Sequence, residues 1–68
     1  MRNPYVTDHI TGATLPDGRP ELAGRNYTRH RLPRRAHKAA ADHNRACPCG
    51  PLVVVVDLRA NRIVEDRS

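Results

Sequence analysis

The sequence contains no tryptophan or phenylalanine and only two tyrosines, so the residues that usually bury the most apolar area are almost absent. A chain of 68 residues has room for one domain, and a domain of that size buries only about 60% of its unfolded surface. The aliphatic residues are concentrated in residues 52–58. Such small domains commonly rely on a disulfide, a metal ion or a second subunit.

Long apolar segments are also missing. No run of about 18 apolar residues occurs, which excludes a transmembrane helix, and the start of the chain lacks the apolar segment of a secretory signal. We therefore expect a cytoplasmic protein that does not bind membranes. In that compartment the two cysteines would be reduced or metal-bound, and a bridge between Cys47 and Cys49 would close a very tight ring across Pro48.

Lysine is nearly absent. Eleven of the twelve basic residues are arginine, and Lys38 is the remaining one. The net charge is +5. Arginine suits phosphate recognition, although GC-rich codon usage produces the same bias. The clustering is more specific, since no acidic residue occurs between Glu21 and Asp42, and a local positive field attracts anions. The residues predicted to contact nucleic acid are Arg29, Arg31, Arg34, Arg35 and Lys38.

The first part of the chain, residues 1–24, is predicted to be loop-rich or partly disordered, ahead of a single small basic domain over residues 25–68. Turn signals occur at residues 11–12 and 16–20, where glycine and proline favour turn conformations. A short hairpin around Thr11 and Gly12 is the ordered alternative.

One helix is predicted over about residues 33–47. Pro33 suits the first helical position, alanines fill the interior, and Pro48 and Gly50 end the helix near Cys47. A spacing of three or four residues predicts a buried stripe of Ala36, Ala39 or Ala40, His43 and Cys47.

A β-hairpin is predicted from about residues 52–58 and 62–66. The first strand is rich in β-branched valine, and Asn61 can take the left-handed conformation in the turn. Because this strand is continuously apolar, it requires cover on both faces, either from the N-terminal segment or from a second subunit. The predicted fold class is therefore α+β, a central helix packed on a C-terminal hairpin and stapled by zinc.

The zinc prediction rests on His43, Cys47 and Cys49. On a helix, His43 and Cys47 are one turn apart on the same face, and Cys49 follows in the next loop. Imidazole and thiolate ligands suit tetrahedral zinc, at one ion per chain. The fourth ligand is left open between His37, His9 and Asp57. Two ordinary reduced cysteines beside a surface histidine are the alternative.

The run from His43 through Cys47, Pro48, Cys49, Gly50 and Pro51, followed by a valine-rich strand, resembles a pattern in small uncharacterised proteins of actinobacterial phages and their hosts. In that pattern a further histidine commonly follows the strand, where this sequence has Asp57. The resemblance implies zinc binding and names no activity.

Two classes of function fit these features. The first is a zinc-stabilised basic module that contacts the nucleic-acid backbone. The second is a protein-interaction or self-associating accessory protein, in which the valine-rich strand pairs with a partner or with a second copy. The chain is too short for a substantial substrate pocket, and His37, His43 and Asn44 are crowded on a single helix, unlike the ligands of His-Asn-His nucleases. We therefore expect no enzymatic activity and no small-molecule substrate.

Overall fold

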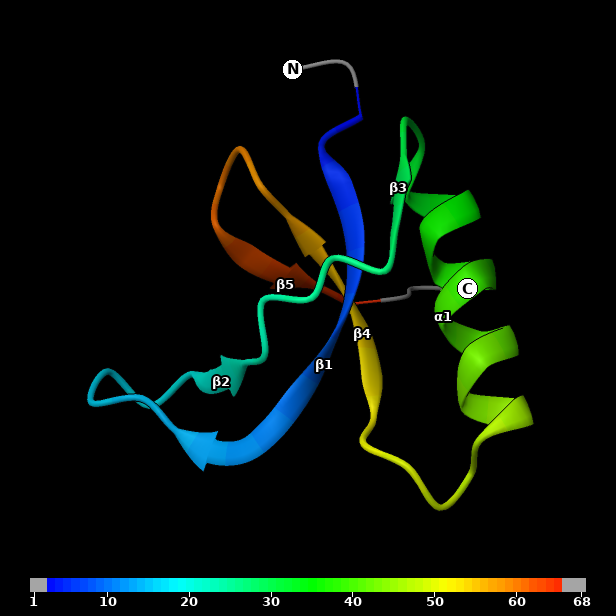
Figure 1. Cartoon of the computed structure of the whole chain (residues 1–68). Coiled ribbons are helices and arrows are strands. Elements are labelled where there is room, and N and C mark those ends of the chain that lie inside the picture. Colours follow the sequence, from blue (N-terminus) through cyan, green and yellow to red (C-terminus); the bar gives the residue numbers. More distant parts are fainter. Residues whose placement is uncertain (1–2, 66–68) are drawn as a thin grey trace.

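A computed structural model describes residues 3–65, which form one helix packed on a curled antiparallel sheet (Figure 1). The α+β class is therefore confirmed. In chain order the elements are β1 (Tyr5–Thr14), β2 (Pro20–Leu22), β3 (Thr28–His30), α1 (Pro33–Ala46), β4 (Val53–Asp57) and β5 (Arg62–Val64). The order in the sheet is β2-β1-β4-β5, and β3 pairs with β1.

The N-terminal segment is a central strand, so the prediction of a loop-rich or partly disordered segment over residues 1–24 is wrong for the residues that the structure describes. Strand β1 pairs with β4 along one edge, where Thr7 stands opposite Val55, and with β3 and β2 along the other. The expected turn at Thr11 and Gly12 lies inside β1 instead, and the hairpin to β2 turns at residues 16–19. The segment is thus part of the same domain as the rest of the chain.

Two buried polar side chains explain how so polar a strand occupies the middle of the sheet. The Thr7 hydroxyl contacts the Thr28 hydroxyl at 2.7 Å and accepts the Thr28 backbone N–H at 3.1 Å. The Asp8 carboxylate, 2% exposed, accepts the backbone N–H groups of His9, Gly24 and Arg25 at 2.8–3.1 Å. These partners satisfy the buried groups, whose desolvation would otherwise be unfavourable.

The C-terminal hairpin is confirmed, with β4 and β5 antiparallel and Val56 opposite Ile63. Asn61 has a φ of 51°, the left-handed conformation predicted for the turn. The predicted end of the return strand at residue 66 lies outside the described residues. Because β4 pairs with β1 on one edge and with β5 on the other, neither edge of the valine-rich strand is open to a partner.

Both faces of β4 are covered, as its composition predicts. Val53 and Val55 lie under α1 in a cluster with Ala36 and Ala40, and Tyr5 and Val64 pack at its margin. Val56 faces the other way, because side chains alternate along a strand. Val56 and its neighbour Val6 on β1 are 3% and 0% exposed. Both valines of this second face are therefore shielded from solvent.

Helix α1 begins at Pro33 and ends at Ala46, as predicted, with Cys47 as its C-cap. The predicted buried stripe is only partly right. Ala36 and Ala40 are buried and Asn44 is half-buried, whereas His43 and Cys47 are exposed. The reason is that the Asn44 amide donates to the Val53 carbonyl at 3.0 Å and accepts the Val53 N–H at 2.8 Å. This pair of bonds turns residue 44, rather than residue 43, toward β4.

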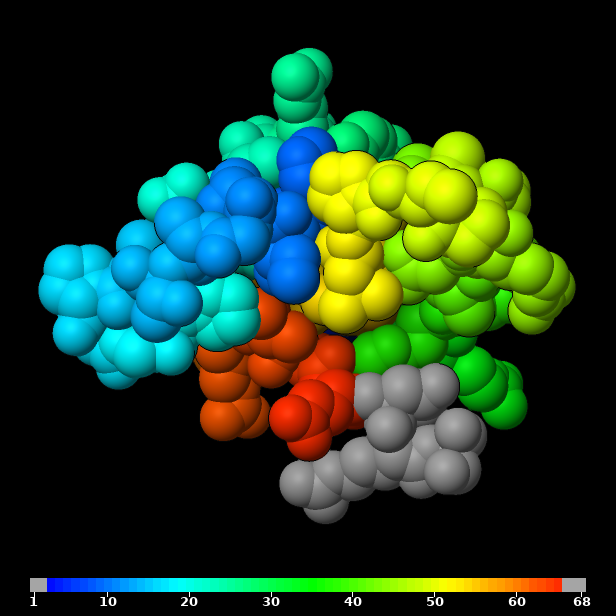
Figure 2. Space-filling view, turned by 90° about the horizontal axis from the view of Figure 1, so that it is seen from below, coloured from blue at the N-terminus to red at the C-terminus, as the bar shows by residue number. Residues whose placement is uncertain are grey.

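The sheet curls until its two terminal strands approach each other. The β1–β2 hairpin and β5 lie side by side in the view from below, in cyan and orange (Figure 2). The Arg19 guanidinium donates to the Asn61 carbonyl at 3.2 Å and so bridges the two ends of the sheet. Within residues 3–65, no helix has the length and apolarity that crossing a membrane requires.

Candidate nucleic-acid interface

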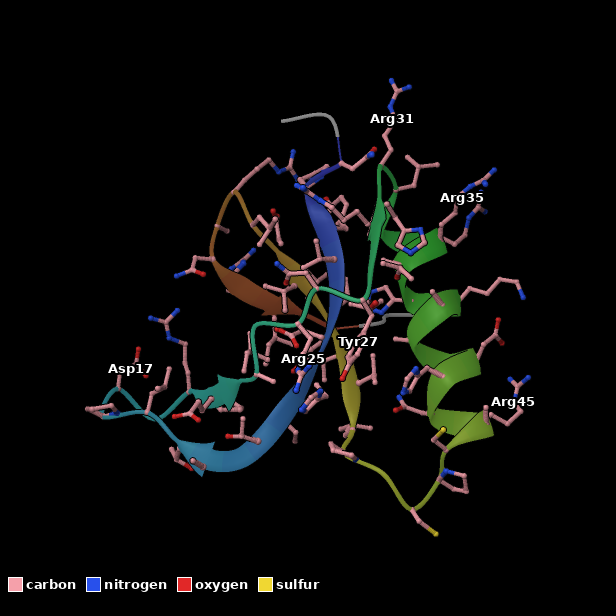
Figure 3. All side chains as sticks on the ribbon, in the orientation of Figure 1. Asp17, Arg25, Tyr27, Arg31, Arg35 and Arg45 are labelled. Atoms are coloured by element: carbon pink, nitrogen blue, oxygen red, sulfur yellow. The ribbon has the colours of Figure 1, made fainter. Side chains whose placement is uncertain are left out.

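Four of the five residues predicted to contact nucleic acid surround the junction of β3 and α1. Arg29 lies on β3, Arg31 follows that strand, and Arg34 and Arg35 occupy the first turn of the helix; all four are exposed. We call these four residues the basic corner. Arg31 and Arg35 extend away from the body of the molecule (Figure 3).

No carboxylate of residues 3–65 forms an ion pair with the basic corner. Among residues 3–65, the ion pairs join Asp17 to Arg19, Asp42 to Lys38 and Arg45, and Asp57 to Arg59. In the basic corner, Arg29 donates to the Asn3 carbonyl at 3.4 Å, a neutral acceptor. The positive field at this corner is therefore available to an anion in solution.

The helix start adds to that field. The N-cap is Leu32, whose side chain makes no capping bond, and the first turn holds no acidic residue. The positive end of the helix dipole thus lies beside Arg34 and Arg35, an arrangement that disfavours folding by about 0.3–1 kcal/mol per charge at low ionic strength. A bound phosphate would relieve this repulsion and accept hydrogen bonds from the free N–H groups.

Lys38, the fifth predicted contact, lies one turn further along α1. Its ammonium is 3.5 Å from the Asp42 carboxylate, which is shared with Arg45 at 3.6 Å. Because Asp42 partly neutralises both cations, the positive field falls along the helix from its start to its end. Lys38 is thus at the margin of the basic corner.

Sequence reasoning missed a row of three rings in which Tyr27 lies between His9 and His43. The Tyr27 ring stacks on His9 at a centroid distance of 5.7 Å and is tilted against His43 at 5.5 Å. The Tyr27 hydroxyl also contacts His9 Nδ1 at 2.5 Å. The three rings come from the β2–β3 loop, β1 and α1, so no local spacing in the sequence could reveal them. The row joins the C-terminal half of α1, through His43, to β1 of the sheet, through His9.

The same loop is held in place by Asp8. Gly24 combines a φ of 78°, which favours glycine, with an N–H donated to Asp8, and the neighbouring Arg25 N–H donates there too. These bonds fix the start of the segment that carries Arg25 and Tyr27 across β1. The buried carboxylate therefore has a structural explanation and requires no catalytic role.

The predicted zinc ligands are not gathered around one point. Within the described part of the chain, no three His, Cys, Asp or Glu side chains form a group that could hold a metal ion. Cys47 and Cys49 are exposed free thiols, and the His43 ring lies against Tyr27. His37 is about 9 Å from His43 along the helix axis. A zinc site would require the turn of residues 47–50 to rearrange.

The other two ligand candidates lie at opposite ends of β4. His9 stands opposite Val53 at the start of the strand, near the cysteine turn. Asp57 is at the other end of the strand, about 13 Å away. The Arg59 side chain donates to its carboxylate, and this hydrogen bond holds the pKa of the Asp57 carboxyl below its usual value. Asp57 therefore has another partner, and of the two only His9 lies at the end of β4 that follows the cysteine turn.

The zinc prediction stays a prediction, and native mass spectrometry of the untagged chain tests it directly. One zinc per chain, removed by chelation and absent from Cys47→Ser, would establish the site. Melting curves recorded in parallel separate a structural role from incidental binding, because loss of a structural metal lowers the Tm. A metal-free chain with an unchanged Tm would contradict the prediction.

In comparisons with known proteins, no family model, no curated protein and no solved structure matches the chain.

Proposed function

We propose that this protein is a small basic module that binds the sugar–phosphate backbone of nucleic acids through the basic corner, Arg29, Arg31, Arg34 and Arg35. The observation that carries the proposal is the absence of any carboxylate partner for these four guanidinium groups among residues 3–65. Three of the described carboxylates, those of Asp17, Asp42 and Asp57, form ion pairs, and each pairs with a cation outside the basic corner. An unneutralised cluster beside an uncapped helix start stabilises a bound polyanion more than it stabilises the fold.

The mode of binding follows from the chemistry of the corner. Guanidinium groups and free helix N–H groups recognise phosphate oxygens and do not read base edges. Tyr27 is close to the helix, but its ring already packs against His9 and His43, and one aromatic residue is too few for a single-strand stacking platform. Binding should therefore be insensitive to base sequence and strongly sensitive to salt.

Fluorescence anisotropy with short labelled single-stranded and duplex oligonucleotides tests this proposal. If all four arginines contact phosphates, log Kobs should fall with log salt with a slope of about −3 between roughly 50 and 200 mM. Two oligonucleotides of different sequence should give equal affinities within about twofold. No detectable binding at low salt would overturn the proposal.

A matched pair of substitutions locates the interface. Arg35→Gln should weaken binding by about tenfold and reduce the salt slope by about one unit. Arg45→Gln removes the same charge from an exposed site at the other end of the same helix, where Asp42 already pairs with it. We expect the second variant to bind as the wild type does. Equal losses in both would show that net charge alone, and not the basic corner, drives association.

A further inference from the structure

An apolar groove of about 400 Å³ lies between the two terminal strands of the sheet, so the expectation that the chain is too short for a substantial pocket is wrong. Leu15, Leu22 and Ile63 line it together with Pro20, and Arg19, Asn61 and Arg62 complete the lining. Leu15 is 38% exposed, one of the large apolar side chains that the fold leaves open to solvent. None of these residues belongs to the basic corner, so the groove is a separate feature of the molecule.

The groove is bordered by backbone groups that can pair with another strand. Strands β2 and β5 are the two ends of the sheet, and within residues 3–65 each hydrogen-bonds to one neighbour only. Their outer edges therefore present backbone N–H and C=O groups beside an apolar surface. An extended segment can bond to such an edge while every second side chain enters the groove.

The positive charge at the groove favours peptide segments that carry acidic side chains. Arg19 is already paired, at 2.7 Å from the Asp17 carboxylate. Arg62 is exposed, and no carboxylate of the described residues lies within ion-pair distance of its guanidinium. An acidic side chain in the bound segment would complement Arg62, whereas a basic one would be repelled.

We propose that this groove binds an extended, acidic–apolar peptide segment of a partner protein, which adds a strand between β2 and β5 and closes the curled sheet. The valine-rich strand β4 cannot serve this purpose, because both of its edges are already paired. The proposed protein-binding site is therefore the groove between β2 and β5, and not the valine-rich strand β4 that the sequence suggested. The proposal is independent of nucleic-acid binding, which uses other residues.

A labelled synthetic peptide of alternating glutamate and valine or leucine is the probe. We expect saturable binding to the full chain, with amide NMR shifts concentrated in β2 and β5. The same peptide with lysine in place of glutamate, and one with proline at the central position, should both bind at least about tenfold more weakly. Arg62→Glu should reverse the preference between the glutamate and lysine peptides.

Leu15→Gln and Leu52→Gln form the matched pair of variants. Both replace an exposed leucine outside the helix, but only Leu15 lines the groove. The first should weaken peptide binding by about tenfold and the second should leave it unchanged, with equal Tm values as evidence of folding. Equal binding by both variants, or no binding of any peptide, would overturn the proposal. A dimer that Leu15→Gln dissociates would also overturn it, since the occupant would then be a second copy of this chain.

Discussion

Replacing Asp8 with alanine is expected to destabilise the protein by about 2–4 kcal/mol, since three backbone N–H groups lose their shared, buried acceptor together. A chain of 68 residues has a total stability of about 3–10 kcal/mol. The loss is therefore a large fraction of the whole. Urea denaturation followed by far-UV circular dichroism measures it.

Two further substitutions test whether the loss of stability is specific to the buried Asp8 carboxylate. Asp17→Ala removes an exposed carboxylate that also accepts a backbone N–H, from Arg19, and should leave the denaturation midpoint nearly unchanged, because solvent screens an exposed ion pair. Asp8→Asn keeps one acceptor oxygen but places an amide N–H₂ among the backbone donors, so its effect should be intermediate. An unchanged midpoint for Asp8→Ala would show that Asp8 does not hold the loop at residues 23–25.

Replacing Asn44 with alanine is expected to cost about 2–3 kcal/mol. The side-chain amide satisfies both the N–H and the C=O of Val53, and a buried backbone group that loses its partner destabilises the fold more than the average hydrogen bond stabilises it. Because these bonds attach the end of α1 to the start of β4, the helix should lose its fixed position on the sheet. Hydrogen exchange at the Val53 amide, measured by NMR, should become much faster.

Arg45→Ala is the control for this effect. It changes the neighbouring helix position, but its side chain is 79% exposed and makes only a surface ion pair with Asp42. Its free energy of unfolding should stay within about 0.5 kcal/mol of the wild type. If Asn44→Ala behaved like Arg45→Ala, the docking of α1 would have to depend on the alanine contacts alone.

Both predictions concern polar side chains because the apolar core is small. Alanine and valine make up the buried hydrophobic residues among those described, and each contributes little area compared with an aromatic residue. Asp8, Thr7 and Asn44 connect segments distant in sequence through side-chain bonds to backbone groups. In this protein, these side-chain bonds cross-link the segments around the small apolar core.

The local elements were predictable because their signals are local. Proline at the first helical position, an alanine-rich interior and a following proline define α1 within a few residues of sequence. A run of valines and an asparagine in the turn define the β4–β5 hairpin in the same way. Each of these features depends on the conformational preferences of adjacent residues, so the sequence alone was enough to place them.

Strand β1, the ring row and the groove were decided only by the tertiary structure. The polar residues of β1 are suited to a buried strand only when Thr28, Gly24 and Arg25 supply their partners, and these partners are 16–21 residues away. Likewise, the hydrogen bond from Asn44 to Val53 sets the rotation of α1 about its axis. With the helix in that rotation, the neighbouring His43 ring packs against Tyr27. The sequence by itself determined the helix, the hairpin and the arginine-rich charge. Which faces are buried, and which edges stay open, depended on contacts that exist only after folding.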